Sequence, residues 1–208
     1  MGVCMFTTQR LILIALCAAL NFSIGSIVYL IKLPVYFDSV GTILCALLIF
    51  PDRKAAFVCC LTCALTSTVF TGLLVNPFLP WFVGTDLVIC LCAAFLTANF
   101  GNTFRARPMQ PVKFGSRVLI AGIVTGVTAA IVSAPVVAYL FGGVTGSGSA
   151  FVVAFFLKTG QQLMNAVLLS GLTADPVDKT LQVLVSALLF RATPADFIAM
   201  VRGTPARV

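Results

Sequence analysis

Apolar runs of about twenty residues, separated by short polar breaks, constrain the fold of this chain more than any other feature. A transmembrane helix needs about 20 mostly apolar residues to cross the roughly 30 Å hydrocarbon core of a bilayer. Hydrophobic residues make up 60% of the sequence and charged residues only 9%, whereas about 25% of the residues in soluble domains are charged. The runs are too many and too long for a cleaved signal peptide, so we expect a polytopic membrane protein.

The breaks between the runs predict an all-α membrane protein, a bundle of six transmembrane helices that forms a single domain over residues 1–208. Proline ends several runs, because it disfavours helix in the residue before it. A last apolar stretch is too short to cross alone and is either an interfacial helix or an extension of the sixth. The predicted spans are residues 11–31, 36–50, 55–75, 81–100, 117–141 and 150–172, and the last stretch is residues 181–190.

Basic residues are distributed unequally between the two sides that six spans define. One side holds only Lys32, and by the positive-inside rule the other side is cytoplasmic. Both termini are therefore expected in the cytoplasm. This bias also accounts for the net charge of +7, so we expect no nucleic-acid partner. The cytoplasmic set comprises Arg10, Arg53, Lys54, Arg105, Arg107, Lys113, Arg117, Lys179, Arg191, Arg202 and Arg207.

Three ionisable residues, Asp38, Asp86 and Lys158, lie inside or at the mouth of predicted spans. A charge at membrane depth costs about 2.5–3.5 kcal/mol on insertion scales unless it is paired or faces a cavity. The predicted topology places all three in the outer half of the bilayer. They are therefore candidate substrate-binding residues in an outward-facing pocket.

A polar stripe accompanies Lys158, since Gln161, Gln162 and Asn165 follow it at the spacing that shares one helix face. Lipid offers these side chains no hydrogen-bond partner, so we expect them to line a pocket between the second, fourth and sixth spans. The loops 32–37, 76–80 and 142–149 would close it. Tyr36, Phe37, Phe78 and Trp81 are candidates for stacking on a ligand, and Asn21, Thr66, Ser67, Thr68 and Thr71 could complete the lining.

Each of these residues has a structural alternative. Asp38 could cap the second helix, and Lys158 could extend its head group to the membrane surface. Asp86 and Lys158 could form an ion pair without a ligand, and the amide stripe could join helices to each other.

The sequence gives little support to catalysis. It contains no histidine and no glutamate, and it lacks the zinc-protease and nucleotide-binding motifs. We expect no catalytic residue, no metal site and no cofactor. Seven cysteines within apolar runs are expected to pack as small hydrophobic residues.

Three further features resemble one family. Ala15 and Ala19 form an A-x-x-x-A pair in the first span, the segment from Lys32 to Thr42 (KLPVYFDSVGT) enters the second span, and Asp178-Lys179 precede a short apolar stretch and Pro194. Over residues 11–190 the chain resembles the substrate-binding S components of energy-coupling factor (ECF) transporters. The usual glycine-proline after the second helix is replaced here by Phe50-Pro51.

This resemblance implies a vitamin or micronutrient importer in the cell membrane of a prokaryote. S components bind their substrate near the extracellular side and associate with a transmembrane T component and two cytosolic ATPases. The resemblance assigns the docking surface for the T component to Ala15 and Ala19, although ordinary internal packing is the alternative for such small residues. A membrane sensor domain and a small ion-coupled transporter, with Asp38 or Asp86 as its protonation site, are the competing classes. The residues suit a zwitterionic or hydrogen-bond-rich heterocycle as the substrate and do not identify it.

Overall fold

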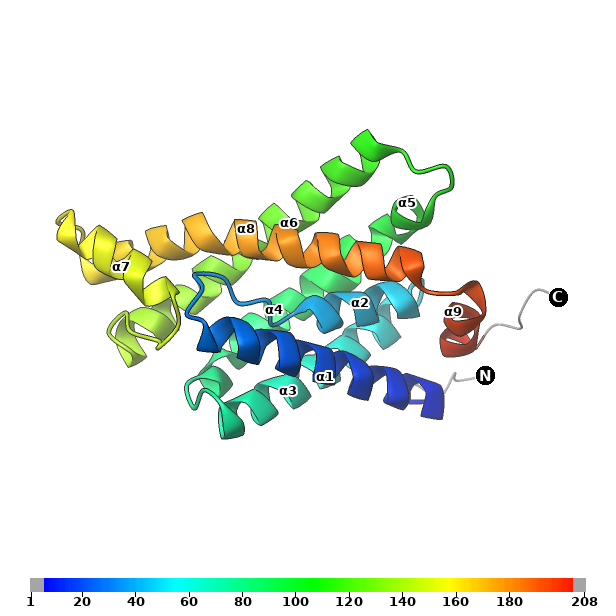
Figure 1. Ribbon diagram of the computed structural model, residues 1–208, viewed down its shortest axis with the longest axis horizontal. Coiled ribbons are helices and arrows are strands. Elements are labelled where there is room, and N and C mark those ends of the chain that lie inside the picture. Colours follow the sequence, from blue (N-terminus) through cyan, green and yellow to red (C-terminus); the bar gives the residue numbers. More distant parts are fainter. Residues whose placement is uncertain (1–5, 204–208) are drawn as a thin grey trace.

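Long helices lie side by side along the long axis of the molecule (Figure 1). The computed structural model describes residues 6–203, so Arg207 lies outside the described residues. The described chain is helical and contains no strand. Its elements are α1 (Thr8–Leu30), α2 (Val40–Ile49), α3 (Arg53–Leu74), η1 (Leu79–Phe82), α4 (Val83–Cys92), η2 (Ala93–Thr97), η3 (Ala98–Phe100), α5 (Gly101–Arg105), α6 (Pro111–Pro135), η4 (Val136–Leu140), α7 (Ser149–Lys158), α8 (Leu163–Ala192) and α9 (Ala195–Arg202).

Four segments of the described chain are long and apolar enough to cross a membrane, namely Thr8–Leu30, Arg53–Leu74, Leu79–Arg105 and Pro111–Leu140. A fifth is added if α8 and α9, which meet at a bend of 101°, are taken as one broken span. The expected all-α membrane protein is thus confirmed at the level of its class.

The second predicted span differs from a full transmembrane helix. Only its second part, α2, is helical. This helix has 10 residues and rises about 15 Å, which is half the thickness of the hydrocarbon core. Residues 33–38 before it form no regular helix. Within α2 every residue except the partly buried Leu44 is buried, which places this short helix at the centre of the bundle.

The sixth predicted span, residues 150–172, is corrected by the structure. α7 ends at Lys158, the chain reverses through a turn at residues 159–162, and α8 then runs back into the bundle. Gly160 adopts a φ of +87° in this turn, a conformation that glycine accepts without steric cost. Since α8 extends to Ala192, residues 181–190 continue the same helix and do not form a separate interfacial one.

Residues 175–179, between the sixth predicted span and the last apolar stretch, are helical as well, because α8 continues through Pro176. Close packing against α6 accompanies this segment. A Cβ on Gly126 would lie 2.5 Å from the Cα of Pro176, and one on Gly122 would lie 2.3 Å from the Cα of Thr180. The two helices therefore approach to a distance that only glycine permits on the α6 side.

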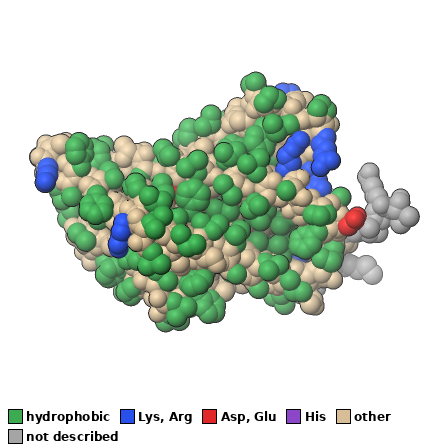
Figure 2. Space-filling model, viewed as in Figure 1, with side chains coloured by type: hydrophobic (Ala, Val, Ile, Leu, Met, Phe, Trp, Pro, Cys, Tyr) green, Lys and Arg blue, Asp and Glu red, His purple; other side chains and the backbone are tan. Residues whose placement is uncertain are grey.

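The two ends of the described chain lie at the same end of the bundle, where Arg10 of α1 donates to the carbonyl of Val201 in α9. Basic side chains gather at this end (Figure 2). Among the described residues, the segments at the opposite end contribute Lys32 and Lys158. Lys179, expected in a cytoplasmic loop, is instead buried in the middle of α8.

The larger of two hydrophobic clusters fills the same half of the bundle as the basic end, and a smaller one joins α6, η4, α7 and α8. The larger cluster packs around α2 and includes the cysteines of α1 to α4, such as Cys45, Cys60 and Cys90. These thiols occupy the positions of small apolar side chains. The other half of the bundle, toward the loops, is where polar side chains are enclosed.

Candidate functional site

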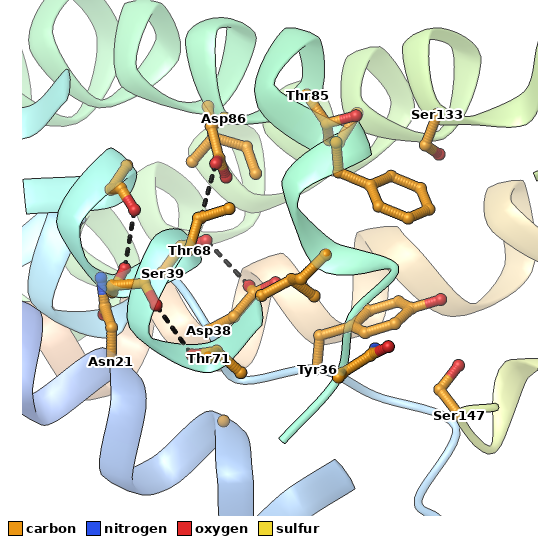
Figure 3. Close-up of a pocket in the computed structure, with 18 of the residues that line it drawn as sticks. Asn21, Tyr36, Asp38, Ser39, Thr68, Thr71, Thr85, Asp86, Ser133 and Ser147 are labelled. Atoms are coloured by element: carbon orange, nitrogen blue, oxygen red, sulfur yellow. Dashed lines mark hydrogen bonds between the residues drawn. The ribbon is translucent and has the colours of Figure 1, made fainter. Parts of the chain in front are cut away.

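A cavity of about 110 Å³ lies in the half of the bundle away from the two chain ends. Its walls come from α1, α3, α4, α6 and α8, and the segment before α2 crosses it. Figure 3 shows Asp86, Thr85 and Ser133 along one side, with Asp38 and Tyr36 opposite them. The lining also includes Asn21, Gly25, Tyr29, Val35, Ser39, Thr42, Ala64, Ser67, Thr68, Thr71, Asn76, Leu79, Phe82, Ile89, Ala129, Val137, Thr145, Ser147, Asp175 and Lys179.

The irregular segment before α2 is held by the side chains of α8. Asp178 Oδ1 accepts from the backbone N–H groups of Tyr36 and Phe37 at 3.0 and 3.1 Å, and Gln182 Oε1 accepts from that of Ser39 at 2.9 Å. Irregular backbone at membrane depth is tolerated only where protein or a water-filled cavity satisfies it. These bonds therefore explain how the chain can be unwound beside the cavity.

Lys179 forms the centre of a buried charge network. Its Nζ lies 2.8 Å from Asp38 Oδ1 and 3.2 Å from Asp178 Oδ2, and Gln182 Nε2 donates to Asp178 at 2.8 Å. The expected alternative that Asp38 caps the second helix is wrong. Ser39 is the N-cap residue of α2, and Asp38 instead binds Lys179.

Two further carboxylates in the cavity lack such a partner. Asp86 accepts one hydrogen bond, from Thr68 Oγ1 at 2.7 Å, and pairs with no cation of the described chain. Asp175 is only 8% exposed, and no described residue donates a hydrogen bond to it or forms an ion pair with it. The hydroxyl of Thr85 is likewise buried without a hydrogen-bond partner among the described residues. The cavity thus presents unused acceptors and donors.

Asn21 of α1 holds the first turn of α2 at the wall of the cavity. Its Oδ1 accepts from the backbone N–H of Gly41 at 2.6 Å, and its Nδ2 donates to Thr42 Oγ1 at 2.9 Å. A Cβ on Gly41 would lie 2.0 Å from the carbonyl oxygen of Cys17. The first turn of α2 therefore packs directly on α1, with Asn21 between them and the cavity.

Loops close the cavity at the end of the bundle that carries Lys32. Tyr36 donates its hydroxyl proton to Ser149 Oγ at 2.8 Å, and Lys32 Nζ donates to the carbonyl of Gly146. The three loops expected to cover a pocket all contribute lining residues, namely Tyr36, Asn76 and Thr145.

The structure separates the candidate residues of the sequence into two groups. Asp38, Asp86 and Tyr36 line the cavity. Lys158, Gln161, Gln162 and Asn165 are exposed at the tip of the α7–α8 hairpin and contribute nothing to the lining. Trp81 is 61% exposed and lies on η1 between two lining residues, Leu79 and Phe82.

The expected stripe beside Lys158 therefore does not exist, because Gln161 and Gln162 belong to the turn that separates α7 from α8. The alternative of an ion pair between Asp86 and Lys158 is wrong as well, since both ion pairs found in the described residues involve Lys179.

Sequence reasoning missed the polar stripe that matters. Asp175, Asp178, Lys179, Gln182 and Ser186 are buried on one face of α8. Their spacing of three, four, seven and eleven residues is the pattern of one helix face, which could have revealed them. Pro176 and the adjacent charges concealed it, because together they are typical of a loop.

Ala15 and Ala19 lie on the outer surface of α1, beside the exposed Leu11, Ile12 and Leu16. The alternative that these alanines serve internal packing is therefore wrong. The face is apolar and exposed, so it can meet lipid or another membrane protein.

No protein-family model, curated protein or solved structure matches this chain. The function must accordingly be argued from the cavity and the surfaces themselves. What the fold and site define is a helical membrane protein with a cavity in the bundle.

Proposed function

We propose that this chain is the substrate-binding subunit of an ATP-driven micronutrient importer, equivalent to the S component of an ECF transporter, in the cell membrane of a prokaryote. The observation that carries the proposal is the cavity in the bundle, in which the carboxylates of Asp86 and Asp175 retain free hydrogen-bonding capacity. Buried polar groups without partners are costly, and a bound polar solute would satisfy them.

The unwound segment before α2 supports a binding role. Discontinuous helices line the substrate sites of many transporters, because the exposed backbone and polar side chains can contact a solute at membrane depth. Here Tyr36 and Asp38 reach the cavity from this segment, while Asp178 and Gln182 hold its backbone from outside the lining.

The distribution of charge supports an outward-facing site. Because basic residues gather at the end that holds α9 and the start of α1, the positive-inside rule favours a cytoplasmic position for that end. The cavity, with the loops of residues 31–39 and 142–148, would then open toward the outside. Residues 36–50 and α8 with α9 complete a six-span arrangement in this proposal.

The proposed partners are a transmembrane T component and two cytosolic ATPases, since the chain carries no nucleotide-binding motif. The proposed docking surface is the exposed face of α1 around Ala15 and Ala19, where small residues at this spacing allow a partner helix to approach closely. Catalysis is not part of this role.

The proposal is tested by uptake and co-purification in one experiment. Ala15→Trp combined with Ala19→Trp is expected to abolish co-purification with ATPases and solute uptake while leaving solute binding to the purified subunit unchanged. Ile27→Trp is the matched control, because Ile27 is 60% exposed near the other end of α1.

Uptake that persists without any ATPase and collapses with the proton gradient would refute the proposal. That outcome would support the small ion-coupled transporter instead, which Asp86 favours as a buried carboxylate with a single hydrogen bond.

A further inference from the structure

We infer that the cavity binds a small organic cation, a protonated amine or a positively charged heterocycle that carries one apolar ring or a short chain. This inference rests on the proposed binding function and specifies its substrate class. It replaces the zwitterionic substrate expected from the sequence, because the lysine on which that expectation depended, Lys158, lies outside the cavity.

The charges of the cavity are unbalanced. Asp38, Asp86, Asp175 and Lys179 line it, and Asp178 lies directly behind Lys179. Lys179 is the only cation of the described chain that lines the cavity, and its contacts are already taken by Asp38 and Asp178. Carboxyl groups therefore outnumber cationic side chains at this site within the part of the chain that the structure describes.

Asp86 and Asp175 both line the cavity, and neither forms an ion pair with a described residue. Asp38 and Lys179 interact electrostatically with both Asp86 and Asp175. Asp175 is more than nine-tenths buried, lines the cavity and lacks a donor. The unpaired hydroxyl of Thr85 adds an acceptor on the α4 side. A ligand ammonium would supply the missing charge and the missing donors together.

The size and the apolar part of the lining limit the ligand. A volume of about 110 Å³ is below the roughly 300–1,000 Å³ of pockets for drug-sized ligands and near the 150 Å³ of a cavity that holds benzene. Leu79, Phe82, Ile89 and Val137 provide apolar contacts beside the acidic ones. A larger cation would require the loops of residues 31–39 and 142–148 to open.

The test uses the full chain in lipid nanodiscs and probes matched in shape but not in charge. Benzylamine, benzyl alcohol and benzoate form one series, and choline with its neutral isostere 3,3-dimethylbutan-1-ol forms another. Binding is followed by the fluorescence of Trp81, which is the single tryptophan of the chain and adjoins the lining residue Phe82. Empty nanodiscs correct for partition of the probes into lipid.

A cation of either series is expected to bind at least about tenfold more tightly than its neutral isostere, which corresponds to about 1.4 kcal/mol, and benzoate is expected not to bind. Asp86→Asn and Asp175→Asn should each weaken cation binding by at least about tenfold. Asp196→Asn is the matched control, because Asp196 is exposed in the first turn of α9 and its loss should change nothing.

Equal or tighter binding of the neutral or anionic probes would overturn the inference and leave the proposed binding function intact. Cation binding that is unaffected by both variants would overturn it as well. If no probe binds, mass spectrometry of the small molecule retained by the purified protein decides between the inference and its alternatives. A retained cation supports the inference, a retained neutral or anionic molecule overturns it, and a protein without any retained molecule overturns both the inference and the proposed function.

Discussion

Asp178 is predicted to be the most important single side chain for the shape of the cavity. Its carboxylate is fully buried and accepts from the backbone N–H groups of Tyr36 and Phe37 and from the side chain of Gln182. Asp178→Ala removes these acceptors while Lys179 keeps its ion pair with Asp38. The unwound segment then has no partner from α8 at residues 36 and 37.

The magnitude follows from the two backbone donors, which cannot rotate away. Each buried donor left without an acceptor costs about 1–3 kcal/mol, so Asp178→Ala should lower the free energy of unfolding by about 2–6 kcal/mol. For a chain of this size about 2–4 °C of melting temperature corresponds to 1 kcal/mol. We therefore expect a decrease of at least about 4 °C. Asp178→Asn should cost less, because its amide oxygen can still accept from both N–H groups.

The assay is thermal unfolding of the purified protein in nanodiscs, combined with hydrogen exchange of the amides of Tyr36 and Phe37. Both amides should exchange slowly in the wild type and rapidly in Asp178→Ala. Asp196→Ala serves as the surface control, with an expected change within about 0.5 kcal/mol. An Asp178→Ala protein that melts with this control and keeps both amides protected would refute the reasoning.

Two further substitutions test the packing and the revised site. Gly126→Ala should destabilise the protein, because the new Cβ would lie 2.5 Å from Pro176. Gly115→Ala on the same helix meets nothing within 4 Å and should be neutral or stabilising by up to about 1 kcal/mol. Equal melting temperatures of the two variants would contradict the close contact of α6 and α8. Lys158→Met should leave the affinity for any retained solute unchanged in a binding titration, since Lys158 is exposed and outside the cavity; a large loss of affinity would return Lys158 to the site.

The sequence was sufficient to predict the class of the fold and part of the lining. Asn21, Asp38 and Asp86 are isolated polar residues in or beside apolar runs, and such residues are expected to face the interior because lipid cannot satisfy them. All three line the cavity. The reasoning succeeded where a polar residue was conspicuous against its surroundings.

The wrong predictions concern segments whose secondary structure the sequence pattern did not reveal. Residues 150–172 are apolar enough to suggest one span, and only the turn at residues 159–162 places Lys158 outside it. Charges beside Pro176 are typical of a loop, whereas Asp178 and Lys179 are buried in the middle of α8. Their burial is explained by the unwound segment at residues 36–39, whose N–H groups need acceptors. That pairing joins residues about 140 positions apart, so no local pattern predicts it.

The central claim is that the cavity holds a small molecule, and native mass spectrometry of the protein released from nanodiscs tests it most directly. Ser133→Phe places a ring in the cavity, and Ile131→Phe is the control on the same helix, because Ile131 is 55% exposed. We predict a one-to-one small-molecule adduct on the wild type and on Ile131→Phe, and its loss from Ser133→Phe. An adduct that survives Ser133→Phe unchanged, or a wild-type protein that carries none and acquires none from a cell extract, would contradict the account.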